Sequence, residues 1–159
     1  MLIKRPATVF QYLCDEFSDA IVDNCCDSGC KLDLRGLDNV VVLKGEKIFP
    51  DRPVCDCIIF SGEETIVAGV VELKSKTVDV SKVKEQLRGG LRFVKEALER
   101  SKTKRFLKNC IVVVLAKKWR THEHRLLTAR KISFDGKNLL IIPKKCGDRL
   151  IDILNCNSK

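Results

Sequence analysis

The chain has 159 residues, 45% of them hydrophobic, which is enough for one ordinary core and predicts a single domain over residues 1–159. Its longest apolar run, residues 110–116, is far shorter than the roughly 20 residues that a membrane-crossing helix needs. The first ten residues, MLIKRPATVF, lack the apolar core of a signal peptide. These features argue against a membrane protein and predict a cytoplasmic one with no membrane partner.

The net charge is +9, from 30 Lys and Arg against 21 Asp and Glu. Residues 74–108 hold 12 basic and 4 acidic side chains, a local excess of +8. This excess is typical of a surface that meets a polyanion such as nucleic acid, but it also fits the solvated face of a Lys-rich helix. Aromatic residues make up only 6%, so base stacking on single strands has little support.

Nine cysteines are many for a chain without an export signal, and they leave three explanations: a metal site, disulfides as in a hyperthermophile's cytoplasm, or buried thiols. The low Gln and Met content and the many charges favour a thermophile. Cys14, Cys25, Cys26, Cys30, Cys55 and Cys57 form one group along the sequence. Because they contain no Cys-x-x-Cys pair, disulfides or buried thiols are favoured over zinc or an iron-sulfur cluster.

The first half of the chain predicts one helix and three strands. Residues 7–22 place Val9, Leu13 and Phe17 on one stripe, which indicates an amphipathic helix. Residues 23–36, rich in Asp, Gly, Ser and Cys, predict an irregular connection. Short apolar runs separated by turn residues then predict three consecutive antiparallel strands, at residues 39–44, 55–60 and 65–74.

The second half alternates helices and strands. Residues 81–100 predict an amphipathic helix with Ser81 as its N-cap. Gly89 and Gly90 should cost that helix about 1 kcal/mol each relative to alanine, which indicates tight packing on the sheet or a close phosphate backbone, with packing favoured. A central strand, a basic helix, a short strand and a closing helix are predicted at residues 109–116, 121–131, 139–143 and 148–154. The fold class is α/β (α+β), with a central mixed sheet flanked by helices.

Three residues on two of these strands could support phosphodiester hydrolysis. Asp56 stands at the head of one strand, and Glu72-Leu73-Lys74 ends the next. Because strand side chains alternate, Glu72 and Lys74 share a face, and a hairpin would bring Asp56 beside them. The two carboxylates and the Leu73 carbonyl are hard oxygen ligands suited to Mg²⁺ or Mn²⁺. Lys74 could then orient or deprotonate a water, or stabilise developing charge.

With the helix before these strands and the helix after them, this pattern resembles the PD-(D/E)XK nuclease superfamily, over residues 7–116. The resemblance implies a restriction-endonuclease-like core in which Asp56 and Glu72 bind metal and Lys74 is the catalytic lysine. It also implies that Glu16 is an accessory acid and that Gln86 matches a glutamine of lambda-exonuclease-like and RecB-like members; junction resolvases use the same core.

Two positions depart from the superfamily pattern. The literal Pro-Asp pair is Pro50-Asp51, so Asp51 stays a reserve candidate for the metal ligand; Asp56 is preferred because the apolar strand starts there. Gly90 stands where a tyrosine usually follows the glutamine, which lowers the weight of a processive exonuclease.

The sequence therefore predicts a Mg²⁺- or Mn²⁺-dependent deoxyribonuclease, in particular an endonuclease acting on DNA, with a homodimer as an open alternative to a monomer. The other hypothesis is a nucleic-acid-binding or assembly module that keeps this scaffold without turnover. In either case the basic residues predicted to contact nucleic acid are Lys76, Arg88, Arg92, Lys118 and Arg120.

Overall fold

The computed structural model describes residues 6–75 and 78–157 as a mixed α/β fold with a seven-stranded mixed sheet in the order β1-β4-β5-β6-β7-β9-β8. The strands of this sheet are β1 (Ile21–Val22), β4 (Val41–Lys44), β5 (Cys57–Ser61), β6 (Ile66–Lys74), β7 (Leu107–Ala116), β8 (Lys131–Phe134) and β9 (Lys137–Lys145). The helices are α1 (Pro6–Glu16), α2 (Gly45–Ile48), α3 (Val80–Arg100), α4 (Thr121–Thr128) and α5 (Leu150–Asn157), with short 3-10 turns η1 (Ser18–Ala20) and η2 (Lys104–Phe106). None of the described helices is long and apolar enough to cross a membrane.

The sheet combines an antiparallel and a parallel part. Strands β4, β5 and β6 pair antiparallel, as the sequence predicts for three consecutive strands. Helix α3 then carries the chain back so that β7 pairs parallel with β6, and β9 pairs parallel with β7. Strand β7 lies in the interior of the sheet, and from Cys110 to Ala116 it is buried, which confirms the prediction of a central strand covered on both faces.

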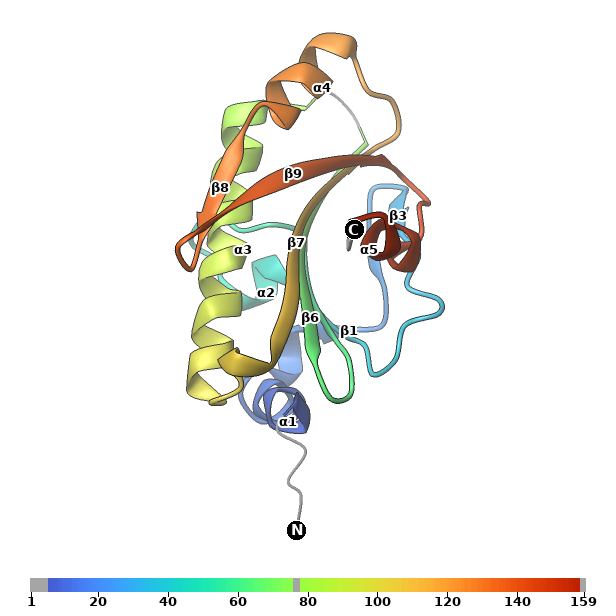
Figure 1. Cartoon of the computed structure of the whole chain (residues 1–159). Helices are drawn as coiled ribbons and strands as arrows, with labels where there is room; N and C mark the ends of the chain where they lie inside the picture. The colour runs from blue at the N-terminus through green and yellow to red at the C-terminus, as the bar shows by residue number, and fades with distance from the viewer. Residues whose placement is uncertain (1–5, 76–77, 158–159) are drawn as a thin grey trace.

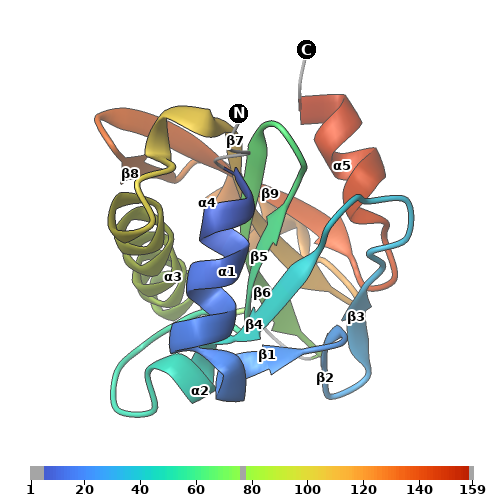
Figure 2. The ribbon, with the colours of Figure 1, turned by 90° about the horizontal axis from the view of Figure 1, so that it is seen from below.

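Two layers cover the faces of this sheet. Helices α1 and α3 lie on one face, and α5 lies on the other together with the small hairpin of β2 (Cys25–Asp27) and β3 (Cys30–Leu32) (Figures 1 and 2). Strand β6 divides its side chains accordingly: Ile66, Ala68 and Val70 join the core under α3, whereas Val71 and Leu73 join the opposite core. By the same alternation, Glu72 and Lys74 belong to the α3 face.

Helix α3 packs so closely that two of its positions must be glycine. A Cβ on Gly89 would overlap the Pro53 carbonyl oxygen, and a Cβ on Gly90 would overlap the Cys55 sulfur. The packing explanation for the glycine pair is therefore confirmed. The predicted N-cap was wrong by two residues: Asp79, not Ser81, caps the helix, because its side chain accepts a hydrogen bond from the Lys82 N–H.

Two predicted helix ends and one predicted irregular connection were wrong, because strand pairing decides the structure in these places. Helix α1 ends at Glu16, not at residue 22, because Ile21 and Val22 pair with β4 instead. The connection at residues 23–36 contains the β2–β3 hairpin, whose turn has positive φ at both Ser28 and Gly29. Helix α4 ends at Thr128, not at residue 131, because Lys131 already pairs with Leu140 in the β8–β9 hairpin.

Two disulfides fasten the β2–β3 hairpin to the rest of the chain. Cys25 is bonded to Cys57 at the start of β5, and Cys30 is bonded to Cys146 after β9. Of the free cysteines, Cys110 is buried, and burial raises the pKa of its thiol to about 12. The two disulfides and the buried thiols of Cys55 and Cys110 confirm that these two predicted forms account for part of the cysteine content.

We expect the variant Cys30→Ala/Cys146→Ala to lose about 3–5 kcal/mol of unfolding free energy, because the bond closes a loop of 116 residues in the unfolded chain. Urea unfolding under non-reducing conditions measures the loss. Cys26→Ala is the control, since Cys26 is exposed and free. Equal stability of the double variant and the unsubstituted protein would contradict the disulfide's stabilising role.

Candidate functional site

Asp56 and Glu72 face each other at one end of the β5–β6 pair. The last ladder pair of the two strands is Cys57 with Val71, and one further step of that register sets Asp56 opposite Glu72. The Cβ atoms of directly opposed residues lie about 4.5–5.5 Å apart, and both side chains project from the same face. The Asp56 carbonyl also accepts a hydrogen bond of 2.9 Å from the Gly45 N–H, which holds this residue beside β4.

Each of the two carboxylates is held by the backbone of the other's strand. The Asp56 N–H donates to Glu72 Oε1 at 3.0 Å, and the Leu73 N–H donates to Asp56 Oδ2 at 2.7 Å. These reciprocal bonds bridge the two strands just beyond the last regular pair. They fix the positions of both acids before any ligand is bound, which is the kind of preorganisation that binding sites need.

Lys74 completes the group. Its Nζ lies 2.8 Å from Glu72 Oε2, while the Glu72 side chain is only 1% exposed and the Lys74 side chain 23%. With both acids ionised the three side chains would carry a net charge of −1 in a largely buried place. A buried negative charge is costly unless a cation or hydrogen bonds compensate it.

The pKa of Glu72 is raised by burial and by this excess of negative charge. Burial, followed by the charge and proximity of Asp56, raises the pKa of Glu72 from 4.5 to about 8, and the Lys74 ammonium only partly opposes the rise. A carboxyl group with such a pKa holds a proton at neutral pH that an exposed glutamate would have lost. Perturbed acids of this kind concentrate at functional sites, although structural ion pairs also produce them.

Gln86 of α3 approaches the same region from above the sheet. Gly90 lies against Cys55 and Val70, and α3 runs in the direction opposite to β6. One helical turn before Gly90 is about as long as two strand residues. The residue one turn before Gly90 is therefore expected above Glu72, two residues after Val70. On this reckoning we expect Gln86 at the level of Glu72. Its Oε1 is buried and has no hydrogen-bond partner among the described residues. A buried acceptor without a donor is unusual in a folded protein and is open to a ligand or water.

The structure brings four of the predicted residues together and leaves others apart. Asp56, Glu72, Leu73 and Lys74 form the connected group. Glu16 is exposed at the end of α1, and no described contact joins it to the group. Asp51, the reserve candidate, is exposed in the turn before Pro53.

The predicted nucleic-acid contacts fall in two places. Lys118 and Arg120 are exposed just beyond β7, whose last residue Ala116 is in register with Lys74, so they lie at the same end of the sheet as the acids. Arg88 and Arg92 are exposed on the outer side of α3. Lys76 lies outside the described residues.

Two supporting residues, Gly45 and Glu123, were not predicted from the sequence. Gly45 donates to the Asp56 carbonyl, and a Cβ there would overlap the Cys55 carbonyl oxygen. Glu123 of α4 is buried and accepts a 2.9 Å hydrogen bond from the Val78 N–H, in the connection between Lys74 and α3. The sequence predicted only a basic helix here, and the period of α4, which also buries Leu127 four residues on, is the signal that could have indicated that Glu123 faces inward.

The donor set fits a hard divalent cation better than a soft one. Both carboxylates and the Leu73 carbonyl are oxygen donors, and within the described residues no Cys or His joins them in a cluster of three. A cation here would offset the burial that raises the pKa of Glu72. Comparisons with protein-family models, curated proteins and solved structures find no match to the chain.

We expect the stability of the metal-free protein to fall as the pH rises from about 5 to about 8. The folded state keeps the Glu72 proton up to a pKa of about 8, whereas the unfolded chain loses it near 4.5, so the contribution of this proton is fully present below 4.5 and is lost as the pH approaches 8. The slope from this one group is at most about 1.4 kcal/mol per pH unit.

Urea unfolding in the presence of a chelator, repeated across this pH range, measures the slope. Glu72→Gln is the matched variant, because the amide has nearly the same shape but does not titrate. Its stability should depend less on pH than that of the unsubstituted protein. Two parallel stability profiles would show that Glu72 does not carry a raised pKa.

Proposed function

We propose that the chain is a divalent-metal-dependent deoxyribonuclease of the PD-(D/E)XK type, acting as an endonuclease. The observation that carries the proposal is the opposed pair Asp56 and Glu72 with Lys74 ion-paired to it, at one end of β5 and β6. The element order gives some support: α1 precedes the antiparallel strands β4, β5 and β6, and α3 and the parallel strand β7 follow them, with β1, the β2–β3 hairpin and α2 as additional elements. The acids stand at the ends of the second and third of these antiparallel strands.

In this proposal Asp56 and Glu72 hold the cation together with the Leu73 carbonyl. The N–H and C=O of one strand residue point to the same side, and the Leu73 N–H already points at Asp56, so its carbonyl faces the same region. Because the Leu73 N–H already bonds Asp56 Oδ2, Asp56 Oδ1 is the oxygen that would meet the cation in this proposal. A bound Mg²⁺ or Mn²⁺ would neutralise charge on the phosphate and make a water a better nucleophile.

Lys74 and Gln86 act around that centre. The Lys74 ammonium, held by Glu72, is partly exposed and can donate a hydrogen bond to an attacking water or to a phosphate oxygen whose negative charge increases. Gln86 Oε1, buried without a partner among the described residues, can accept a hydrogen bond from the same water. Both groups position the reactant, and burial around Glu72 limits competing solvent.

We expect Asp56→Asn, Glu72→Gln and Lys74→Ala each to lower the rate of plasmid cleavage in Mg²⁺ or Mn²⁺ by at least about 100-fold. Gel analysis of supercoiled, nicked and linear plasmid measures the rate. Glu96→Gln is the matched control, because Glu96 is an acid paired with a cation, Arg100, on the exposed side of α3. Cleavage that survives in Glu72→Gln or Lys74→Ala would remove these residues from the catalytic centre.

The second candidate is a nucleic-acid-binding or assembly module without turnover. It is favoured by Gly90 in the place of the usual tyrosine and by the fact that both Glu72 oxygens already have partners within the protein. Calorimetry with Mn²⁺ separates the two candidates. The enzyme should bind one or two ions through Asp56 and Glu72 and lose that heat in Asp56→Asn, whereas the inactive module should give no heat at all.

A further inference from the structure

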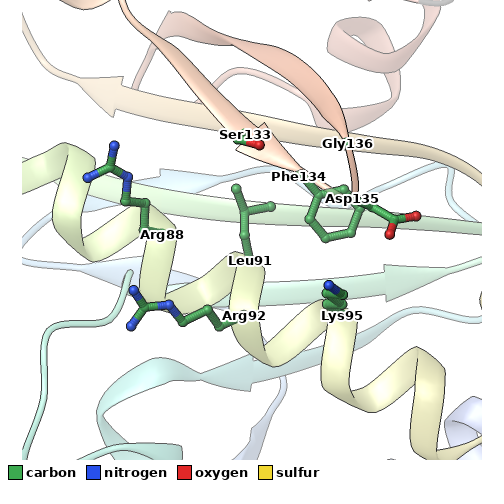
Figure 3. A pocket seen from close by; sticks show the side chains of 8 residues that line it. All are labelled: Arg88, Leu91, Arg92, Lys95, Ser133, Phe134, Asp135 and Gly136. Carbon is green, nitrogen blue, oxygen red and sulfur yellow. The ribbon is translucent and has the colours of Figure 1, made fainter.

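A basic hollow lies between α3 and the β8–β9 hairpin, outside the catalytic group. It has a volume of about 440 Å³ and is lined on the helix side by Arg88, Arg92 and Lys95. Figure 3 shows these three side chains along α3, with the tip of the hairpin, Ser133 to Gly136, opposite them. The hollow is therefore bounded by a rigid helix and a short hairpin and not by a long loop.

Two neighbouring hollows extend it in both directions. One of about 470 Å³ shares Arg88 and Arg92 and reaches the first turns of α3, where Arg52, Lys84 and Arg130 join the lining. Another of about 290 Å³ shares Phe134 and Asp135 and adds Lys104, Lys108 and Lys137. We call the cations of the first two hollows the basic track: Arg52, Lys84, Arg88, Arg92, Lys95 and Arg130.

The basic track carries charge that the protein itself leaves unbalanced. Within the described part of the chain, the acids that line the three hollows are Glu85 and Asp135, and Asp135 is already ion-paired with Lys104 at 2.8 Å. A further hollow beside Arg92 and Lys95 adds Glu96 and Glu99, of which Glu96 is ion-paired with Arg100. Among the described residues, none of the six cations of the track forms an ion pair. Like charges held along one face destabilise the fold slightly, so their arrangement favours an anionic partner.

The spacing along α3 suits a regular polyanion. Lys84, Arg88, Arg92 and Lys95 follow one another at intervals of four, four and three residues, which keeps them along one side of the helix. From Lys84 to Lys95 the helix rises about 16 Å, a distance over which one strand of duplex DNA presents about five phosphates. Arginine matches phosphate oxygens with paired N–H donors, so two arginines in the middle of the row fix the backbone's position.

We infer that the basic track binds the sugar-phosphate backbone of duplex DNA, in a place distinct from the catalytic acids. A membrane surface is a poorer partner, because the large exposed hydrophobic residues in the described part of the chain, Leu126 and Leu140, do not line the hollows. A single strand is also a poorer partner, because the one aromatic side chain there, Phe134, is 8% exposed and offers no stacking surface.

The track leads toward the proposed catalytic centre. Arg52 and Pro53 line the hollow at the first turns of α3, and Asp56 follows Pro53 by three residues, a reach of at most about 10 Å along the chain. DNA bound to the basic track would thus be held close to Asp56 and Glu72, and the segment to be cleaved would reach these acids. This step rests on the proposed nuclease function, whereas binding on the track does not depend on turnover.

The test is fluorescence anisotropy with a labelled duplex of about 30 base pairs in a chelating buffer, using the full chain. Arg88→Ala/Arg92→Ala/Lys95→Ala should raise the Kd at least tenfold and lower the slope of log Kd against log salt by about 2 to 3, because each lost phosphate contact removes about 0.9. The control Lys31→Ala/Lys145→Ala/Arg149→Ala removes three exposed cations away from α3 and should change the Kd less than twofold.

The outcomes separate this inference from the nuclease proposal. If no variant cleaves DNA while the track variant still loses affinity for the duplex, the inference stands alone. Equal affinity of the track variant and the unsubstituted protein would overturn it. Tighter binding of a single strand of the same length would also overturn it, and so would track-dependent binding to phosphatidylserine vesicles without binding to duplex DNA.

Discussion

The register of β5 against β6 is the constraint on which the candidate site depends. Cys57 pairs with Val71, and that pairing sets Asp56 opposite Glu72 on the face covered by α3. A slip of one residue would turn both acids to the other face, because strand side chains alternate. The start of β5 is held accordingly: Gly45 bonds the Asp56 carbonyl, Cys57 is joined to Cys25, and Gly90 lets α3 rest on Cys55. Three different elements thus stabilise one short junction.

The burial of two carboxylates at the start of β5 has an electrostatic free-energy cost that the rest of the fold must offset. Glu72 is almost fully buried beside a second carboxylate, and burial with that neighbour raises its pKa to about 8. A structural ion pair with Lys74 alone would have been less costly, since one acid would balance one base. The second acid makes sense if a cation occupies the site in the working protein. Stability given up at such a place is commonly the consequence of function.

The sequence predicted the parts of the fold whose pattern is local and strong. Strands β5, β6 and β7 and helix α3 were found within a few residues, because long apolar runs and a 3.6-residue period leave few alternatives. The opposed acids followed from alternation and one hairpin. Strand β8 was missed although Asp135-Gly136 forms its turn with positive φ at both residues, a recognised hairpin signal. The ends of α1 and α4 depend on strand pairings made elsewhere in the chain, which no local pattern contains.

Helix α3 contacts the strands and lines the basic hollows through neighbouring parts of its surface. Gly89 and Gly90 lack Cβ atoms, which lets the helix lie directly on residues 53–55 and on Val70. Arg88 and Arg92 line a hollow together with Gly89, and with Lys95 they line the hollow under the β8–β9 hairpin. Larger residues in place of the glycines would push the helix away from the junction that holds Asp56, and would move the cations with it. The glycine pair therefore sets the distance between the basic track and the acids, so the two sites are coupled through the packing of a single helix.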